Sequence, residues 1–221
     1  MRNEMRFLSS VILFIYSIVA YAENPQGEPE IYTLNAQLLA GAKQQDIARV
    51  KRVIEEGAKL DSRNRFGKTA LFIFAEQGNL ELVKYLLDLG ADPNIPTLEK
   101  VTPVMFSAYS GNLPMLTMLV DHGASIDEED QVFKTAIVYA AGEGHVDVLK
   151  YLLDKNIPIN RQYNHDLTIL MWAAGLGRLE AVKLLIDRGA DTSLKDDRGK
   201  NAKEIATQAG QNEIASLLGS D

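Results

Sequence analysis

The chain has 221 residues, with 23 lysines and arginines against 30 aspartates and glutamates, and a formal net charge of −7. An acidic chain lacks the positive footprint that nucleic-acid binding needs, so we expect no nucleic-acid partner. Cysteine is absent, which excludes disulfides, a lipid-modified cysteine and thiolate metal ligands, and leaves packing as the source of stability.

The first 22 residues predict a cleaved export signal. Arg2 and Arg6 precede an apolar stretch at 7–19, and the Ala-Tyr-Ala at 20–22 is typical of a signal-peptidase site, so the mature protein would start at Glu23. The stretch is shorter than the roughly 20 residues that span a bilayer. A cleaved signal and a periplasmic or secreted protein are therefore favoured, with an uncleaved anchor as the alternative.

Residues 23–30 are polar and contain two prolines, which predicts a short extended linker. The remainder, 31–221, reads as one domain with a 33-residue period. The period is plainest in two ladders of glycines, which are Gly78, Gly111, Gly144, Gly177 and Gly210, and Gly57, Gly90, Gly123 and Gly189. The second ladder has Asn156 where a glycine is missing. Glycine and asparagine are the residues that favour the left-handed conformation at helix ends, so the ladders indicate recurring helix ends.

Each unit predicts two helices. A threonine or asparagine recurs before a short apolar run, where its side chain can cap a helix start, at Thr69, Thr102, Thr135, Thr168 and Asn201. After the next glycine comes an apolar stripe with spacings of three and four, as in Leu116, Leu119 and Val120 or Leu149, Leu152 and Leu153. We expect these stripes to be buried.

Segments such as FGKTALFIFAEQGNLELVKYLLDLGADPN at 66–94 resemble ankyrin repeats. The resemblance implies an all-α solenoid of stacked helix-turn-helix units with short β-hairpin-like loops. Its expected units are an N-terminal cap at 34–65, full repeats at 66–98, 99–131, 132–164 and 165–197, and a C-terminal cap at 198–221. The sequence departs from the pattern at the TPLH histidine, which is replaced by Phe72, Met105, Val138 and Met171. It also departs at the glycine before the threonine, which is replaced by Lys100, Phe133 and Asp166.

No catalytic constellation is apparent, and we expect no enzymatic activity, no cofactor and no metal. His122, His145 and His165 do not share the four-residue spacing of a helical metal pair. An enzyme or haem carrier would have to use His165, Met105 and Met171, which are a poor set for that chemistry.

The resemblance implies that a partner protein is held on the concave side, formed by the first helices and the loop tips. One column there is apolar, at Ile73, Phe106, Tyr139 and Trp172, and such a column either packs between repeats, which is its commoner use, or contacts a partner. The residues that we predict to contact the partner are Phe66, Leu98, Tyr109, Val132, Leu167, Trp172 and Leu176.

The sequence thus predicts a monomeric, non-enzymatic scaffold that binds another exported protein as an adaptor or regulator. An immunity or inhibitor protein that neutralises a secreted toxic effector is the alternative. Assistance to a haem or redox enzyme is the third possibility. Fold alone does not identify the partner.

Overall fold

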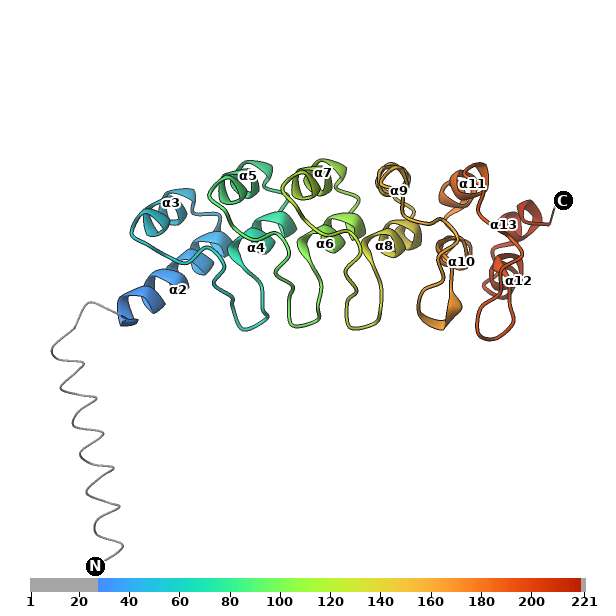
Figure 1. Cartoon of the computed structure of the whole chain (residues 1–221), viewed down its shortest axis with the longest axis horizontal. Helices are drawn as coiled ribbons and strands as arrows, with labels where there is room; N and C mark the ends of the chain where they lie inside the picture. Colours follow the sequence, from blue (N-terminus) through green and yellow to red (C-terminus); the bar gives the residue numbers. More distant parts are fainter. Residues whose placement is uncertain (1–27, 220–221) are drawn as a thin grey trace, which may run out of the picture. The chain divides into compact units, whose positions relative to one another are not determined.

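The computed structural model describes residues 28–219 (Figure 1). The predicted export signal and most of the predicted linker lie outside the described residues. The first helix, α2 (Glu28–Gln44), starts within the last three residues of that linker. The chain divides into two compact units, 1–62 and 63–221, and each is described by itself.

The first unit is a helix pair, α2 and α3 (Ile47–Glu55). Leu38 and Ala42 of α2 and Val50 and Val53 of α3 are fully buried, so the two helices share an apolar contact. Gln45 stands where later repeats carry a glycine, and it adopts the same left-handed backbone, with φ of 56°. Asp46 then caps α3.

The second unit contains five further helix pairs, and Figure 1 shows them in two layers. One layer consists of α4 (Ala70–Glu76), α6 (Pro103–Tyr109), α8 (Ala136–Glu143), α10 (Ile169–Gly175) and α12 (Ala202–Gln208). The other consists of α5 (Leu80–Asp88), α7 (Leu113–Asp121), α9 (Val146–Asp154), α11 (Leu179–Asp187) and α13 (Asn212–Leu217). Within each layer every helix packs on the next. The described residues contain no strand, and the predicted all-α solenoid is confirmed.

The caps predicted at the first helices are present with one exception. The side chains of Thr69, Thr102 and Thr168 each accept a hydrogen bond from the backbone N–H three residues later, and Asn201 does the same. Thr135 makes no such bond, so α8 starts without a side-chain cap. Asn79 and Asn112 cap α5 and α7 in the same way, a role that the sequence analysis missed.

The apolar stripes of the second layer are buried at their middle positions, but their first members are not, and Val120 and Ile186 at the end of two stripes are half-buried. Leu80, Leu113, Val146 and Leu179 are half-buried, whereas the residue two positions later is buried in each helix, at Leu82, Met115, Val148 and Ala181. Lys84 and Lys150, which lie off the stripe, are exposed as expected.

Five tip turns precede the helices of the first layer, at 64–68, 97–101, 130–134, 163–167 and 196–200. In each, the N–H of the first residue donates to the carbonyl of the last, across 2.9–3.1 Å. Where glycine is replaced, Lys100, Phe133 and Asp166 take the left-handed backbone themselves, with φ of 60°, 61° and 55°. The tight turns therefore persist without glycine.

A side chain at the first turn position holds four of the five turns. Asn64, Asp130 and Asp196 each accept two backbone N–H bonds with one side-chain oxygen, and Thr97 accepts one. Such local acceptors stabilise turns and tolerate left-handed residues. The fourth turn has Tyr163 at this position, and there two successive residues, His165 and Asp166, are left-handed within a 3-10 turn, Asn164–Asp166.

Adjacent tip turns are joined by backbone hydrogen bonds at three of four junctions. Leu98 N–H donates to the Phe66 carbonyl, Gln131 N–H to Glu99, and Asp197 N–H to His165, at 3.0–3.1 Å. The equivalent bond at the third junction, from Asn164 to Val132, is absent from the described structure. Below the tips, Asn94 accepts from Ser125 N–H and Asn160 from Asp191 N–H, both at 2.8 Å.

At the third junction the residue equivalent to Ser125 is Pro158, which has no N–H to donate. Arg161 instead approaches Asp127 and Glu129 at 3.5 and 3.6 Å. Such partly exposed ion pairs contribute little to stability. The tip turns and the loops below them are thus held less by directional bonds at the third junction than at its neighbours. Nearer the helices, the same junction is bridged by side chains, because Arg178 Nε donates to the Gly142 carbonyl at 2.8 Å and Arg188 Nη1 to Asp154 at 2.9 Å.

Candidate functional site

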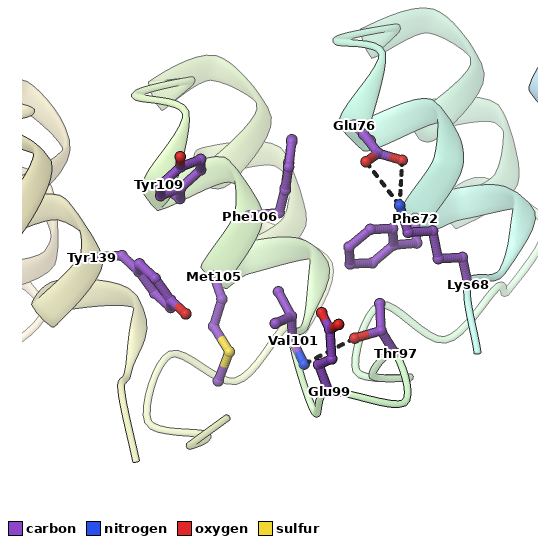
Figure 2. Close-up of a pocket in the computed structure, with 10 residues that line it drawn as sticks. All are labelled: Lys68, Phe72, Glu76, Thr97, Glu99, Val101, Met105, Phe106, Tyr109 and Tyr139. Atoms are coloured by element: carbon purple, nitrogen blue, oxygen red, sulfur yellow. Dashed lines mark hydrogen bonds and ion pairs between the residues drawn. The ribbon is translucent and has the colours of Figure 1, made fainter. Parts of the chain in front are cut away.

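A groove of about 260 Å³ crosses the first helices of three successive repeats (Figure 2). Its walls come from α4, α6 and α8, and its floor from tip turn 97–101. The lining residues are Lys68, Phe72, Glu76, Thr97, Glu99, Val101, Met105, Phe106, Tyr109 and Tyr139. We call this the aromatic groove.

Four aromatic rings follow one another along this groove. The ring centroids of Phe72 and Phe106 are 5.9 Å apart, those of Phe106 and Tyr109 6.3 Å, and those of Tyr109 and Tyr139 5.9 Å. The last pair meets edge to face, at 85°. These separations fall within the range in which aromatic pairs attract, so the rings hold one another in place.

The first end of the groove is bordered by an internal ion pair. Lys68 Nζ donates to both carboxylate oxygens of Glu76 at 2.8 Å and lies 5.3 Å from the centre of the Phe72 ring (Figure 2). The ammonium therefore lies within cation–π distance of Phe72 while it neutralises Glu76.

At the other end, Tyr139 donates its hydroxyl hydrogen bond to Asp130. Burial, and this bond to a carboxylate, raise the pKa of Tyr139 far above its usual value, so the phenol stays neutral and its ring is fixed. Lys134 Nζ lies 5.4 Å from the Tyr139 ring centre and 4.6 Å from that of Trp172. Asp130 thus links the third tip turn to the wall of the groove.

The structure places the predicted contact residues unequally. Five are exposed, namely Phe66 (53%), Leu98 (62%), Tyr109 (49%), Val132 (56%) and Leu176 (48%), whereas Leu167 and Trp172 are half-buried. Leu98 and Phe66 adjoin through their backbone hydrogen bond. Only Tyr109 of the seven lines the aromatic groove.

The apolar column of the first helices is neither wholly core nor wholly surface. Ile73 is buried, while Phe106, Tyr139 and Trp172 are half-buried. The Trp172 indole nitrogen is buried and has no hydrogen-bond partner among the described residues, which fits a packing role for that residue. Phe106 and Tyr139 pack between repeats on one side and present the other side to the groove.

Seven groove residues were not singled out from the sequence for this surface, namely Lys68, Phe72, Glu76, Thr97, Glu99, Val101 and Met105. Phe72 carried a usable signal, because it replaces the histidine of the repeat pattern with a ring one position before the apolar column. The charged residues carried none, since lysines and glutamates are common on any solvated face.

The histidines serve local contacts. His145 Nε2 lies 2.8 Å from the Tyr109 carbonyl oxygen, so this nitrogen carries the proton and joins two repeats. His165 Nδ1 lies 2.7 Å from an Asp197 carboxylate oxygen. Within residues 28–219, no three histidine or acidic side chains group as metal ligands do, and no helix has the length and hydropathy for a membrane span.

Comparison with known proteins identifies the family to which this architecture belongs. The family model described as ankyrin repeats (3 copies) matches residues 38–130, 128–196 and 163–221. Among solved structures, the crystal structure of EF0377, an ankyrin repeat protein, matches with a TM-score of 0.76 and 30% sequence identity. The match covers 84% of this chain and 98% of that chain. No relative was found among the curated proteins.

Proposed function

Because this chain belongs to the ankyrin-repeat family, we propose that it is a binding module that holds another exported protein against the aromatic groove and the adjacent tip turns. Ankyrin repeats are generally protein–protein interaction modules and typically non-catalytic scaffolds. The observation that carries the proposal is Tyr109, a large aromatic side chain that lines a groove and yet is half exposed. Tyrosine, tryptophan and arginine dominate the binding energy of protein interfaces.

The apolar tips extend this surface. Phe66, Leu98 and Val132 are exposed on the tip turns that border α4, α6 and α8, where polar residues are the usual choice. Because the turns are held by Asn64, Thr97 and Asp130, the apolar side chains are not needed to form them. Contact with a partner explains their presence.

The groove proposal is tested by placing a photoreactive phenylalanine analogue at position 109 and, as a control, at the exposed position 150 in the other layer. Position 109 should crosslink a specific protein, which is then purified and its affinity measured by calorimetry. Tyr109→Ala and Leu176→Ala should weaken that affinity by more than about 1 kcal/mol and leave the melting temperature unchanged. Loss of stability with unaltered affinity would contradict the proposal.

We place this activity after export, as that of an adaptor or regulator, on the strength of the N-terminal sequence. Arg2 and Arg6, the apolar stretch at 7–19 and the Ala-Tyr-Ala at 20–22 have the order of a cleaved signal. Intact-mass measurement of protein from the cell should show Glu23 as the first residue. Retention of Met1 in a membrane fraction would contradict export, and a captured partner that proves to be a toxin would favour the inhibitor role.

A further inference from the structure

We propose that the centre of the aromatic groove receives a basic side chain, arginine or lysine, from an extended segment of the partner protein. The inference rests on the proposed function and gives the chemistry of its occupant. It depends on the rings of Phe106 and Tyr109 and on the carboxylate of Glu99, all of which line the groove.

The first argument is the pattern of cations along the rings. At one end Lys68 lies 5.3 Å from the centre of Phe72, and at the other Lys134 lies 5.4 Å from that of Tyr139. The two middle rings, Phe106 and Tyr109, have no such cation among the described residues. The groove thus uses cation–π contacts at both ends and leaves its centre open to one supplied from outside.

The second argument is charge. Glu76 is neutralised by Lys68, and Asp130 accepts hydrogen bonds from the Tyr139 hydroxyl and from two backbone N–H groups. Glu99 makes no side-chain ion pair or hydrogen bond in the described structure, although it lies close enough to Tyr139 to help raise the pKa of that phenol. A basic side chain in the groove would supply the missing counter-charge.

One cation beside the groove, Lys134, would oppose this occupant. Its ammonium lies nearer to the Trp172 ring than to Tyr139, at 4.6 against 5.4 Å, which places it toward α10 and away from Phe106. The chain as a whole is acidic, with a net charge of −7. A basic segment is therefore attracted at long range as well as at the rings.

The third argument is size. The groove volume of about 260 Å³ lies below the roughly 300–1,000 Å³ of sites that enclose drug-sized ligands. It suits one long side chain rather than a helix or a cofactor. Arginine fits best, because its planar guanidinium can stack on an aromatic ring while it pairs with a carboxylate.

The test uses purified full-length protein and two probes, the blocked tripeptide Gly-Arg-Gly and its counterpart with citrulline, an uncharged isostere of arginine. Binding is followed by chemical shifts of the backbone amides at 97–109. The arginine peptide should bind about three- to tenfold more tightly than the citrulline peptide, because only a cation gains from the rings and Glu99. Equal affinities, or no binding of either peptide, would overturn the proposal.

Two variants locate the site. Glu99→Gln keeps the shape of the side chain and should weaken the arginine peptide by about two- to fivefold, and Tyr109→Leu keeps an apolar group and should weaken it by about three- to tenfold. The control Glu81→Gln alters an exposed carboxylate on α5 and should change nothing. An equal effect of Glu81→Gln, or none of Glu99→Gln, would contradict the assignment.

The outcome separates this inference from the proposed function. If a protein crosslinked at position 109 retains its full affinity for the Glu99→Gln variant, the binding face stands and the basic occupant is wrong. If the arginine peptide binds at Glu99 and Tyr109 but position 109 captures no protein, the groove chemistry stands and the proposed protein partner fails.

Discussion

The second and third junctions of the repeat array occupy equivalent places and are held differently. At the second, Gln131 N–H donates to Glu99 and Ser125 N–H to Asn94, so two repeats share backbone hydrogen bonds at the tip and below it. At the third, both are missing from the described structure, and partly exposed ion pairs of Arg161 stand in their place. Pro158, which has no N–H, accounts for the loss below the tip, and the tip bond is lost beside the one turn that lacks a side-chain anchor, that of Tyr163.

The difference teaches that hydrophobic stacking and directional bonding are separable in this fold. The helices α8 and α10 pack on each other like their neighbours, although the loops between them lack the usual bonds. In a solenoid, stability is a sum of repeat and nearest-neighbour terms, so a weaker junction is the place where the array would first separate. The aromatic groove, which spans α4, α6 and α8, lies on the side where adjacent tip turns share backbone hydrogen bonds.

The largest test compares Leu119→Ala in α7 with Leu152→Ala in α9, two side chains that are fully buried. Each should lower the free energy of unfolding by about 2–5 kcal/mol through the cavity that it leaves. Leu152→Ala should also split chemical unfolding into two transitions, because it weakens the junction whose tip turns share no backbone hydrogen bond in the described structure. Lys150→Ala, in the same helix but exposed, is the control, and a comparable loss there would mean that the stripe is misassigned.

The next test concerns the tip turns. Asp130→Ala removes the acceptor of two backbone N–H groups and of the Tyr139 hydroxyl, and should cost about 1–3 kcal/mol in thermal unfolding. Asp130→Asn keeps a side-chain oxygen for the turn and should cost less. If alanine and asparagine are equally harmless, the side chain does not hold the turn, and the contrast with Tyr163 loses its meaning.

Hydrogen exchange gives a direct measure of the junctions. The amide of Asn164 has no acceptor across the third junction, whereas the equivalent amides of Leu98, Gln131 and Asp197 each donate to the preceding tip. We expect Asn164 to exchange at least about tenfold faster than the slowest of the three, by mass spectrometry or NMR at neutral pH. Equal protection at all four positions would show that the third junction is as closed as the others.

The smallest effect is expected at Asn156, the one helix end of its ladder without glycine. Its φ of 65° is left-handed, which glycine adopts more readily. Asn156→Gly should therefore be neutral or mildly stabilising, by less than about 1 kcal/mol in the melting transition. Marked destabilisation would assign the Asn156 side chain a further task at the third junction.

Much of the fold followed from periodic residues. The two glycine ladders placed the helix ends, and the left-handed backbone of Asn156 confirms the interpretation of its exception. The turns at Lys100 and Phe133 could not be predicted from those residues, because the side chain that holds each turn is three positions earlier, at Thr97 and Asp130. Asn64, Thr97 and Asp130 share few features in sequence beyond a side-chain oxygen, so their common role becomes visible only with the hydrogen bonds.

The sequence predicted which aromatic residues lie near one another in the candidate site, but not how far each ring is buried. Phe106 and Tyr139 recur at the repeat period, and Tyr109 is three residues after Phe106, so their neighbourhood could be inferred. Whether a ring is covered depends on the packing of the adjacent repeat, which the period does not contain. The groove also needed Phe72, which lies one position before the column, and the charges of Lys68 and Glu99, whose directions only the structure gives.

The first three tip turns are held by their main chain and by side chains that precede or begin the turn, namely Arg63, Asn64, Thr97 and Asp130. The side chains of Phe66, Glu99 and Val132, two residues after the first residue of each turn, take no part in the bonds that close the loop. These positions can change identity while the turn keeps its shape, as the immunoglobulin scaffold allows in its variable loops. A related chain could therefore acquire a new partner through substitutions at these tip positions, because such substitutions change the surface with little loss of folding stability.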